Sequence, residues 1–327
     1  MPAASVVAVV VAYNRRELLA ETLRGLRAQT VAPVRIVVVD NASTDGTTAM
    51  VGTDFDEVEL VTLERNTGGA GGFAVGIERA LQFDPQWVWV MDDDTVPLPE
   101  ALSAMLEFST KLPEAAVLAS RVLWTDSREH PMNMPRRRPF TRVSAAAAAA
   151  GGYPIRSISF VSAMFRTGAI RRSGLPIADY FLWNDDFEFS TRVLRRRQGF
   201  LVTSSVVEHR TTTFGGTDAD PGARFYLEVR NKVWLLTRSN SLGPLERLLY
   251  GGSTLRRWAR TFARSKNRGL LADGLRRGLR DGITGRPRPN AEVLADLDTE
   301  LVRGQREVAD AVDRPDRAPA AGRGRRG

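Results

Sequence analysis

The stretch Trp87-Val-Trp-Val-Met-Asp-Asp-Asp94 decides the fold class of this sequence. It opens with an unbroken apolar run, which is typical of a strand buried on both faces, and three carboxylates follow at once. In a parallel sheet, ligands bind at the edge where such strands end. The position of these three acids at a strand end therefore indicates a ligand-binding site as much as their charge does.

Strand and helix patterns alternate on the N-terminal side of this stretch. Residues 6–13 and 36–39 are β-branched runs of strand length, and residues 58–65 have the pattern of a third strand. Between them, residues 15–29 carry leucines at helical spacing, and residues 72–81 form a further helical pattern. This alternation predicts an α/β fold with a mostly parallel central sheet flanked by helices.

The second half of the chain has a less regular pattern. We expect a low-complexity connector over 144–152, a strand over 157–165, a helix over 185–197, a strand over 200–207 and a helix over 223–238. Basic helical segments follow. This division predicts a catalytic domain over 1–240, a basic helical C-terminal region over 241–314 and a disordered tail over 315–327.

Charge is distributed unevenly along the 327 residues, whose net charge is +8. Residues 251–290 hold eleven Lys/Arg and two acids, so this segment alone carries +9 and the rest of the chain is close to neutral. A nucleic-acid-binding protein would spread its positive charge over the domain, so we expect no nucleic-acid partner. The absence of cysteine excludes disulfides and thiolate metal sites.

The acid cluster Asp92-Asp93-Asp94 favours a divalent metal site. Crowded carboxylates repel one another unless a cation compensates them, and Mg²⁺ or Mn²⁺ takes such oxygens together with substrate phosphates. In an arbitrary loop, a solvated acidic turn would be the simpler interpretation. His209 follows another β-rich run and is a candidate third ligand beside Asp94 and Asp92, although a lone histidine is more often structural.

Three other motifs allow two interpretations each. Asp40 ends a strand and either binds a nucleotide or caps the turn that follows it. The glycine-rich stretch Asn66–Phe73 lets the backbone approach a ligand, but it lacks the lysine of a phosphate-binding loop. The stretch Trp183–Phe189 places three acids at a helix start, where capping would explain one or two, and Asp186 or Asp185 is a candidate general base.

Together, the order of these motifs resembles the family 2 glycosyltransferases of GT-A fold over about residues 5–240. The resemblance rests on Ala12-Tyr-Asn-Arg15, Val38-Val-Asp-Asn-Ala-Ser-Thr-Asp-Gly46, Asp92-Asp93-Asp94 and the acidic motif Asn184–Phe189. Arg65-Asn-Thr-Gly-Gly-Ala-Gly-Gly-Phe73, Trp-Val-Met-Asp-Asp-Asp and Arg224-Phe-Tyr…Arg230-Asn231 are also similar to the actinobacterial galactofuranosyltransferases, which build cell-wall galactan from UDP-galactofuranose.

The resemblance implies an inverting, metal-dependent transfer of a sugar to a hydroxyl of a lipid-linked cell-wall glycan. Asp186 would be the catalytic base, with Asp185 beside it, and a divalent cation (Mn²⁺ or Mg²⁺) would be the cofactor. The implied metal ligands are Asp94, Asp92 and His209. The implied donor-binding residues are Tyr13, Asp40, Arg65, Asn66, Gly71, Gly72, Asp92 and Asp93.

Several alternatives stay open at this point. A family 2 transferase with another donor, such as dTDP-rhamnose, fits the same motifs. A sugar-1-phosphate nucleotidyltransferase would need glycines after the first strand, where Ala12-Tyr-Asn-Arg-Arg16 has none. A membrane-docked protein that binds sugar nucleotides without turnover is disfavoured by the presence of Asp94, Asp186 and His209 together.

For location, the sequence predicts a cytoplasmic protein that is peripheral on the inner face of the cell membrane. No apolar run approaches the roughly 18 residues of a membrane span. The segment 255–280 mixes basic residues with Leu255, Trp258 and Phe262 at helical spacing, a pattern that suits an interfacial helix on anionic lipid. The alternative is that these helices pack on the catalytic domain.

Overall fold

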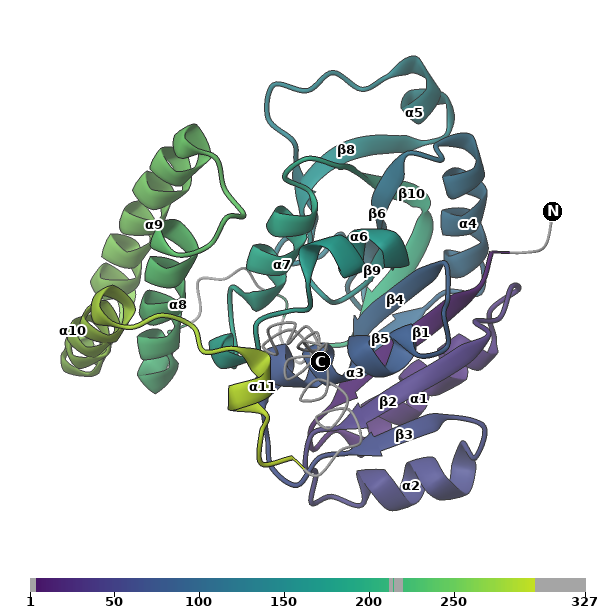
Figure 1. The fold of residues 1–327 in the computed structure, drawn as a ribbon, viewed down its shortest axis with the longest axis horizontal. Coiled ribbons are helices and arrows are strands. Elements are labelled where there is room, and N and C mark those ends of the chain that lie inside the picture. Colours follow the sequence, from purple (N-terminus) through teal and green to yellow (C-terminus); the bar gives the residue numbers. More distant parts are fainter. Residues whose placement is uncertain (1–3, 212–213, 215–219, 298–327) are drawn as a thin grey trace, which may run out of the picture.

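A computed structural model describes residues 4–211, 214 and 220–297 (Figure 1). The N-terminal part alternates strands and helices: β1 (Val6–Ala12), α1 (Arg16–Arg27), β2 (Arg35–Asp40), α2 (Thr47–Asp54), β3 (Glu59–Thr62), α3 (Gly68–Leu81) and β4 (Trp87–Asp92). The middle part contains β5 (Thr95–Pro97), α4 (Ala101–Lys111), β6 (Ala115–Leu123), β7 (Arg136–Arg137), α5 (Ala145–Ala149), β8 (Gly152–Ser157), β9 (Ala163–Arg166), α6 (Thr167–Ser173), the 3-10 helix η1 (Ala178–Tyr180) and α7 (Asp185–Val193). It is followed by β10 (Gln198–His209), the 3-10 helix η2 (Gly222–Arg224), α8 (Phe225–Thr237), α9 (Pro244–Arg264), α10 (Arg268–Thr284) and α11 (Asn290–Val293).

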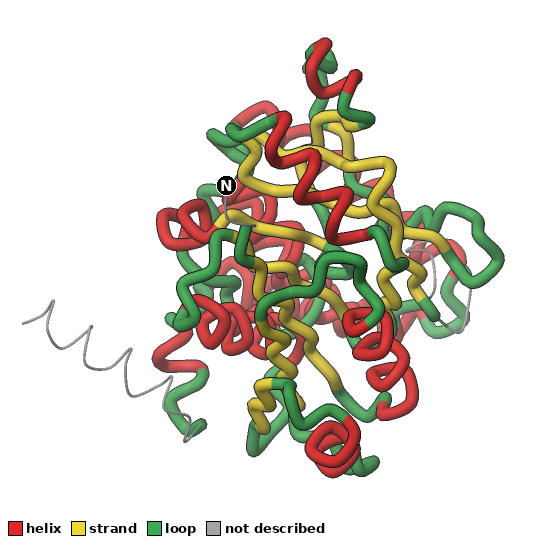
Figure 2. The backbone as a smooth tube through the Cα atoms, turned by 90° about the vertical axis from the view of Figure 1, so that its right-hand side faces the viewer, coloured by secondary structure: helices red, strands yellow, loops and turns green. Residues whose placement is uncertain are grey.

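The described strands form one sheet of ten, in the order β3-β2-β1-β4-β9-β6-β10-β8-β7, with β5 paired to β10. The strands β3, β2, β1 and β4 run parallel, as predicted from the alternating pattern. β9 lies between β4 and β6 and runs antiparallel to both, so the sheet is mixed. Helices cover both faces (Figure 2), which confirms the predicted α/β architecture.

Buried side chains alternate between the two faces of the sheet. Val7, Val9 and Val11 of β1 join the core under α3, α6 and α7, whereas Val6 and Ala8 join the core under α1, α2 and α4. This period of two on a strand that is apolar throughout is what a doubly covered sheet requires. The acidic ends of β2 and β4 project from the same edge of this core.

Some predicted elements differ from the structure. The segment 157–165, expected to be one strand, contains the end of β8, a loop and β9. The loop residues Ile158, Phe160 and Val161 are as deeply buried as strand residues, so their hydrophobicity suggested a strand. The connector over 144–152 contains α5 and the start of β8. The helix α3 begins at Gly68 rather than Gly72, so the expected glycine-rich loop is its first turn.

The C-terminal helices α8, α9 and α10 pack on one another beside the sheet (Figure 1). Glycines make the close contact of α10 with α8 possible, since a Cβ on Gly278 or Gly282 would lie 2.7 Å from the Cβ of Val229 or Val233. After α10 the chain returns to the sheet, where Leu294 and Leu297 enter the main core. The predicted tail over 315–327 lies outside the described residues.

This packing corrects the predicted membrane face. Trp258 is buried and makes an edge-to-face contact with Phe225 of α8, and Phe262 contacts the same ring. Leu271 is buried with them, and Leu275 and Leu279 pack around the same small core. Of the predicted face Leu255, Trp258 and Phe262, Leu255 is 65% exposed, Phe262 is partly buried and Trp258 is buried. In the described part of the chain, no helix is both long and apolar enough to cross a bilayer.

Candidate active site

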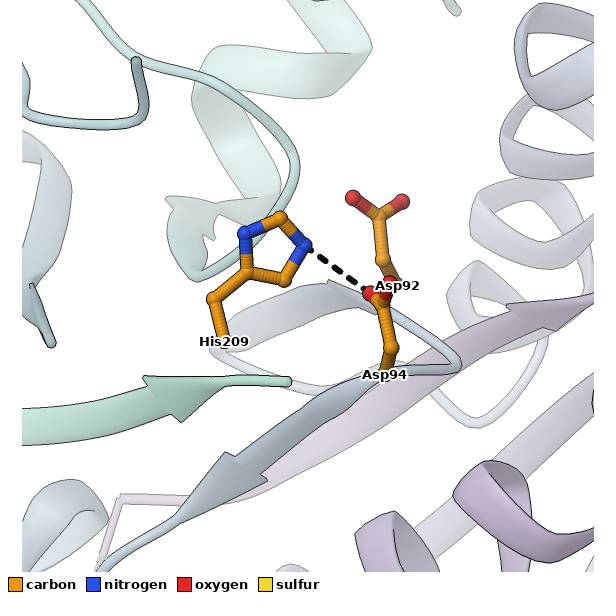
Figure 3. Close-up of side chains that lie close together, drawn as sticks. All are labelled: Asp92, Asp94 and His209. Carbon is orange, nitrogen blue, oxygen red and sulfur yellow. Dashed lines mark hydrogen bonds and ion pairs between the residues drawn. The ribbon is translucent and has the colours of Figure 1, made fainter. Parts of the chain in front are cut away.

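The three aspartates lie where β4 ends, in the middle of the sheet. β5 starts directly after Asp94 and pairs antiparallel with the end of β10, which sets Thr95 opposite His209. The backbone N–H of Arg210 donates to the carbonyl of Asp94 at 2.8 Å. Through this strand pairing, His209 lies beside Asp94 although 115 residues separate them in the chain (Figure 3).

Asp92, Asp94 and His209 form the candidate metal site. One potential ligand atom from each lies within 4.8 Å of the other two. His209 Nε2 is 2.9 Å from Asp94 Oδ1, and His209 Nδ1 is 3.0 Å from Asn133 Oδ1. Because an amide oxygen only accepts, Nδ1 carries a proton and Nε2 faces the acids, the orientation that a metal-binding imidazole takes. The residues therefore fit a divalent cation.

The charges of the cluster also favour a cation. Burial, with the charge of Asp94, raises the pKa of Asp92 to about 7, and burial raises the pKa of Asp93 to about 6. Burial would raise the pKa of Asp94 as well, but the hydrogen bond from His209 holds it below its ordinary value. Burial lowers the pKa of His209, yet Asp94 outweighs this effect and raises it. Asp92 therefore ionises less readily than a free carboxyl, and a divalent ion bound beside it would favour its charged form.

Arg15 connects the acids to the turn after β1. Its Nη1 lies 3.2 Å from Asp93 Oδ1 and 2.5 Å from Asp94 Oδ2. Asp93 also accepts from the backbone N–H of Tyr13 at 3.0 Å, so this carboxylate orients the turn. Tyr13 is 45% exposed at this position. Contact of Tyr13 and Asp93 with a nucleotide stays a prediction.

Asp40 caps the turn after β2. It is fully buried, and its Oδ1 accepts from the backbone N–H of Ser43 at 2.9 Å, while its Oδ2 accepts from the hydroxyl of Thr48. Asn66 acts similarly before α3, where its Oδ1 accepts from the N–H of Gly68 at 2.7 Å. Both residues lie at the ligand edge of the sheet, and their contact with a donor stays a prediction.

Gly71 and Gly72 are buried inside α3. A Cβ on Gly71 would lie 2.5 Å from Thr67, and a Cβ on Gly72 would lie 2.5 Å from Val11 of β1. Close packing of α3 thus explains both glycines without a ligand. Arg65 is also occupied, since its Nε and Nη2 lie 2.6 Å and 2.8 Å from the carboxylate of Asp296. Donor contacts from these three residues remain predictions.

The loop before α7 is strained and tightly held. Phe181, Trp183 and Asn184 all have a positive φ, which is unfavourable for residues with a side chain and clusters at functional sites. The side-chain amide of Asn231 in α8 donates to the carbonyls of Tyr180, Leu182 and Trp183 at 2.8–2.9 Å. Asn184 stands at the N-cap position, but its side chain contacts Glu228 and Lys232 instead of capping the helix.

Asp185 and Asp186 occupy the first turn of α7. Burial, with the charge of Asp186, raises the pKa of Asp185 well above its usual range. Burial also raises the pKa of Asp186, whereas Lys232 and Arg136 act to lower it. Asp186 is partly exposed and accepts from the N–H of Phe187 at 2.6 Å. An accessible carboxylate with a raised pKa is suited to accept a proton near neutral pH.

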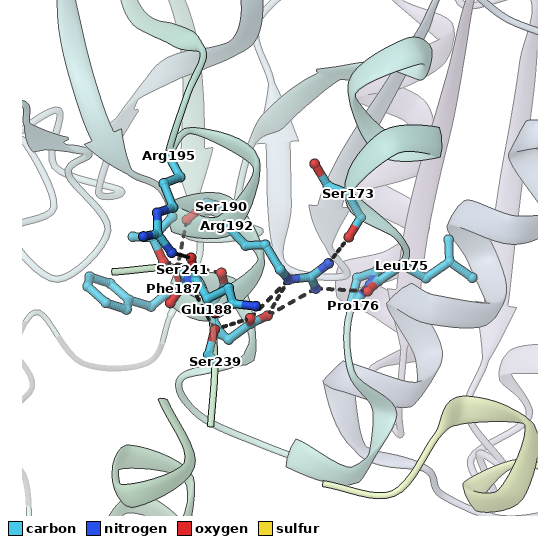
Figure 4. Close-up of polar contacts among 12 residues, drawn as sticks. Ser173, Leu175, Pro176, Phe187, Glu188, Ser190, Arg192, Arg195, Ser239 and Ser241 are labelled. Carbon is cyan, nitrogen blue, oxygen red and sulfur yellow. Dashed lines mark hydrogen bonds and ion pairs between the residues drawn. The ribbon is translucent and has the colours of Figure 1, made fainter. Parts of the chain in front are cut away.

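A buried ion pair holds α7 in position (Figure 4). Arg192 lies 2.9 Å from Glu188, whose side chain is 1% exposed, and Ser239 donates to Glu188 at 2.6 Å. Arg192 also donates to the carbonyl of Leu175 at 2.9 Å. These contacts join α7 to the segments on either side of it. Asp186 is therefore carried on a rigid helix end.

The comparison with family models decides the classification. The model described as "Glycosyl transferase family 2" matches residues 7–174, slightly more than half of the chain. The chain belongs to this family. The matched region contains the acid cluster, and α7, His209 and the C-terminal helices lie beyond it.

Individual relatives agree with this classification. The chain is 29% identical over 267 residues to the galactofuranosyltransferase GlfT1 of Mycolicibacterium smegmatis, which covers 75% of this chain and 88% of the relative. Among solved structures, it is similar to S. aureus TarS 1–349 in complex with UDP-GlcNAc (TM-score 0.59, 17% identity, covering 96% of this chain and 95% of TarS 1–349). It is also similar to GalNAc-T7 with UDP, GalNAc and Mn²⁺ (TM-score 0.56, 13% identity, covering 90% and 56%). These two likenesses establish the fold.

The sequence did not reveal several residues that shape this family 2 site. Arg15 and Asn133 contact the candidate metal ligands, and Lys232 and Arg136 act on Asp186. His130, in the loop after β6, is fully buried with its ring centroid 5.3 Å from that of His209. Of these residues, only Arg15 could have been found from the sequence, because it belongs to the quoted family motif Ala12-Tyr-Asn-Arg15.

Proposed function

We propose that this family 2 enzyme transfers galactofuranose from UDP-galactofuranose to a hydroxyl of a lipid-linked glycan, with inversion and with a divalent metal. The observation that carries the proposal is the Asp92, Asp94 and His209 cluster at the ligand edge of the sheet. Asp186 on α7 supplies a separate carboxylate with a raised pKa. The two sets provide what the reaction needs: stabilisation of the leaving group and removal of a proton.

Asp94, Asp92 and His209 are the residues that would hold the cation. A divalent ion bound there supplies Lewis-acid stabilisation to the departing nucleoside diphosphate. Asn133 keeps the imidazole facing the acids, and Arg15 adds a positive charge beside them. The structure of GalNAc-T7, a structural neighbour, contains UDP, GalNAc and Mn²⁺, which supports a cation and a nucleotide sharing this site.

On the acceptor side, Asp186 removes the proton of the attacking hydroxyl. The hydroxyl oxygen forms the new glycosidic bond to the anomeric carbon as the bond to the diphosphate breaks on the opposite face. Tyr13, Asp40, Arg65, Asn66, Gly71, Gly72 and Asp93 are the proposed donor-side residues. For Arg65, binding a nucleotide would require exchange of its ion pair with Asp296.

The proposed donor sugar rests on the similarity to GlfT1, whose name describes galactofuranosyl transfer. The TarS structure contains UDP-GlcNAc, which supports a UDP-sugar in general. The test is a panel of UDP-galactofuranose, UDP-GlcNAc and dTDP-rhamnose, each offered with Mn²⁺ and a lipid-linked glycan acceptor. We expect a product only with UDP-galactofuranose. Turnover of dTDP-rhamnose with none of UDP-galactofuranose would show that the donor is misassigned.

A further inference from the structure

A cationic cavity opens between α7, α8 and α9, next to the proposed base. Its volume is about 550 Å³, and among the described residues no carboxylate lines it. Phe187, the residue after Asp186, forms part of its wall. Its basic lining residues are Arg136, Lys232, Arg256, Arg257 and Arg260.

The positive charges of this cavity are only partly compensated. Arg257 pairs with Glu228, and Lys232 donates to Asn184. Arg256 and Arg260 are exposed and form no ion pair with any residue that the structure describes. Arg136 lies over the rings of Phe187 and Tyr250, at 5.4 Å and 5.8 Å from their centroids. Such a group of like charges is stabilised when an anion enters.

Lys232 is the buried member of the group, with only 7% of its surface exposed. Burial, together with the charges of Arg257 and Arg136, lowers its pKa to about 8 even though Glu228 opposes this change. A buried ammonium that lies among guanidinium groups is costly in a protein without a ligand. The cavity is therefore prepared for a strongly anionic group.

The helix α9 carries exposed apolar residues in its first turns and basic residues in its later turns. Arg256, Arg257 and Arg260 recur at helical spacing and line the cavity. Leu245, Leu248 and Leu249 of the same helix are 62%, 73% and 54% exposed. A ligand that contacts both sets of residues would carry an anionic group close to an apolar chain.

We propose that this cavity binds the phosphate or diphosphate group that links the acceptor glycan to its lipid. The assignment rests on the proposed transferase function and adds a specificity-determining site to it. The anion occupies the cavity beside Phe187, the glycan extends towards Asp186, and the lipid leaves along the exposed leucines of α9. Acceptor selection then depends on the anionic linkage as well as on the sugar.

The first test is binding of inorganic pyrophosphate to the full-length protein in excess chelator, measured by calorimetry. Chelator removes the metal that would otherwise recruit pyrophosphate to the donor side. We expect the double variant Arg256→Gln/Arg260→Gln to bind about tenfold more weakly than wild type, since charge-assisted hydrogen bonds are lost. The matched control is Arg276→Gln, an exposed arginine of α10 outside the cavity, which should bind like wild type. Equal affinity of the double variant and wild type would refute the site.

The second test identifies the source of the phosphate. Transfer is measured to one glycan on a diphosphate-linked short lipid and on a neutral alkyl chain. We expect the double variant to lose about tenfold of the preference in kcat/KM for the diphosphate acceptor. An unchanged preference, with weaker binding to anionic vesicles, would assign the cavity to bilayer headgroups and overturn the acceptor role. Pyrophosphate binding without transfer from any sugar nucleotide would instead refute the transferase proposal and leave the anion site standing.

Discussion

Asp186 is the proposed base that takes the proton of the acceptor hydroxyl. An amide at this position keeps the shape of the side chain but cannot take a proton from the acceptor. We predict that Asp186→Asn lowers the transfer rate by about 10²–10⁴-fold, the usual contribution of a general base. UDP should still protect the variant against heat, since donor binding uses other residues.

Asp185→Asn is the matched control for this prediction. The pKa of Asp185 is raised well above its usual range, so an amide there removes less negative charge than at Asp186. We expect a smaller loss of rate for this variant. Equal transfer by wild type and Asp186→Asn would rule out Asp186 as the base.

The pH dependence of transfer follows from the same carboxylate. The base works when ionised, and burial raises its pKa above the ordinary value of 3.8, so kcat/KM should rise with pH along a limb centred above 3.8. Lys232 lowers this pKa, and we predict that Lys232→Met moves the limb to higher pH. The profile is compared with that of Lys111→Met, an exposed lysine in α4. A limb that stays in place would show that Lys232 does not act on the base.

The site was predictable where it follows strand ends and hidden where it depends on tertiary contacts. Asp94 and His209 each follow an apolar strand, so their position at one edge of the sheet could be inferred, whereas the antiparallel pairing of β5 with β10 that brings them into contact could not. Asn133 contacts His209 from 76 residues away, and Lys232 reaches Asn184 across 48 residues. No local pattern reports such pairs, because either residue alone looks like an ordinary polar side chain.

The helices and strands were also predicted only in part from the sequence pattern. The β-branched runs of β1 and β2 were recognised because both faces are buried, whereas β9 was merged with the buried loop before it. Hydrophobicity measures burial and cannot show where hydrogen-bonded pairing stops. The first turn of α3 was taken for a loop because glycine disfavours helices. A Cβ at Gly68 would lie 2.0 Å from the carbonyl oxygen of Phe181, so this tight contact requires glycine there.

We propose that the exposed leucines of α9, rather than the predicted face Leu255, Trp258 and Phe262, form the surface that docks on a membrane. Leu245, Leu248, Leu249 and Leu255 are exposed at roughly helical spacing, and the helix is basic. We predict that full-length protein binds anionic vesicles and that salt weakens the binding, as expected of an interfacial helix. The triple variant Leu245→Gln/Leu248→Gln/Leu249→Gln should lose this binding in co-sedimentation.

Substituting the exposed leucines tests this prediction better than a chain that ends within α9, because such a chain also lacks α10. Removing α10 would uncover the apolar residues of α8 that it covers, and these could bind vesicles non-specifically. The control is Val34→Gln, an exposed apolar residue between α1 and β2 that is 60% exposed. If the triple variant and the control bind vesicles alike, α9 is not the docking element.

At the scale of the whole molecule, our proposals assign the two substrates to different parts of the fold, the donor to the sheet and the acceptor to the C-terminal helices. The edge of the sheet gathers Asp92, Asp94 and His209, the candidate metal ligands on the proposed donor side. The helices α8 and α9 add Lys232 and the arginines of the cavity on the acceptor side. Asp186 lies between them on α7, whose preceding loop is held by Asn231 of α8. The C-terminal helices thus form part of the proposed active site.

The measurement that tests the metal-dependent transfer most directly is UDP release in the presence of acceptor, after treatment with chelator and then with increasing Mn²⁺. The comparison includes wild type, Asp94→Ala and the control Asp126→Ala, which replaces an exposed acid near β6. We predict that chelator abolishes release by wild type and Asp126→Ala, and that Mn²⁺ restores both. Asp94→Ala should stay at background at every Mn²⁺ concentration. Full release by wild type in excess chelator would contradict the metal-dependent mechanism.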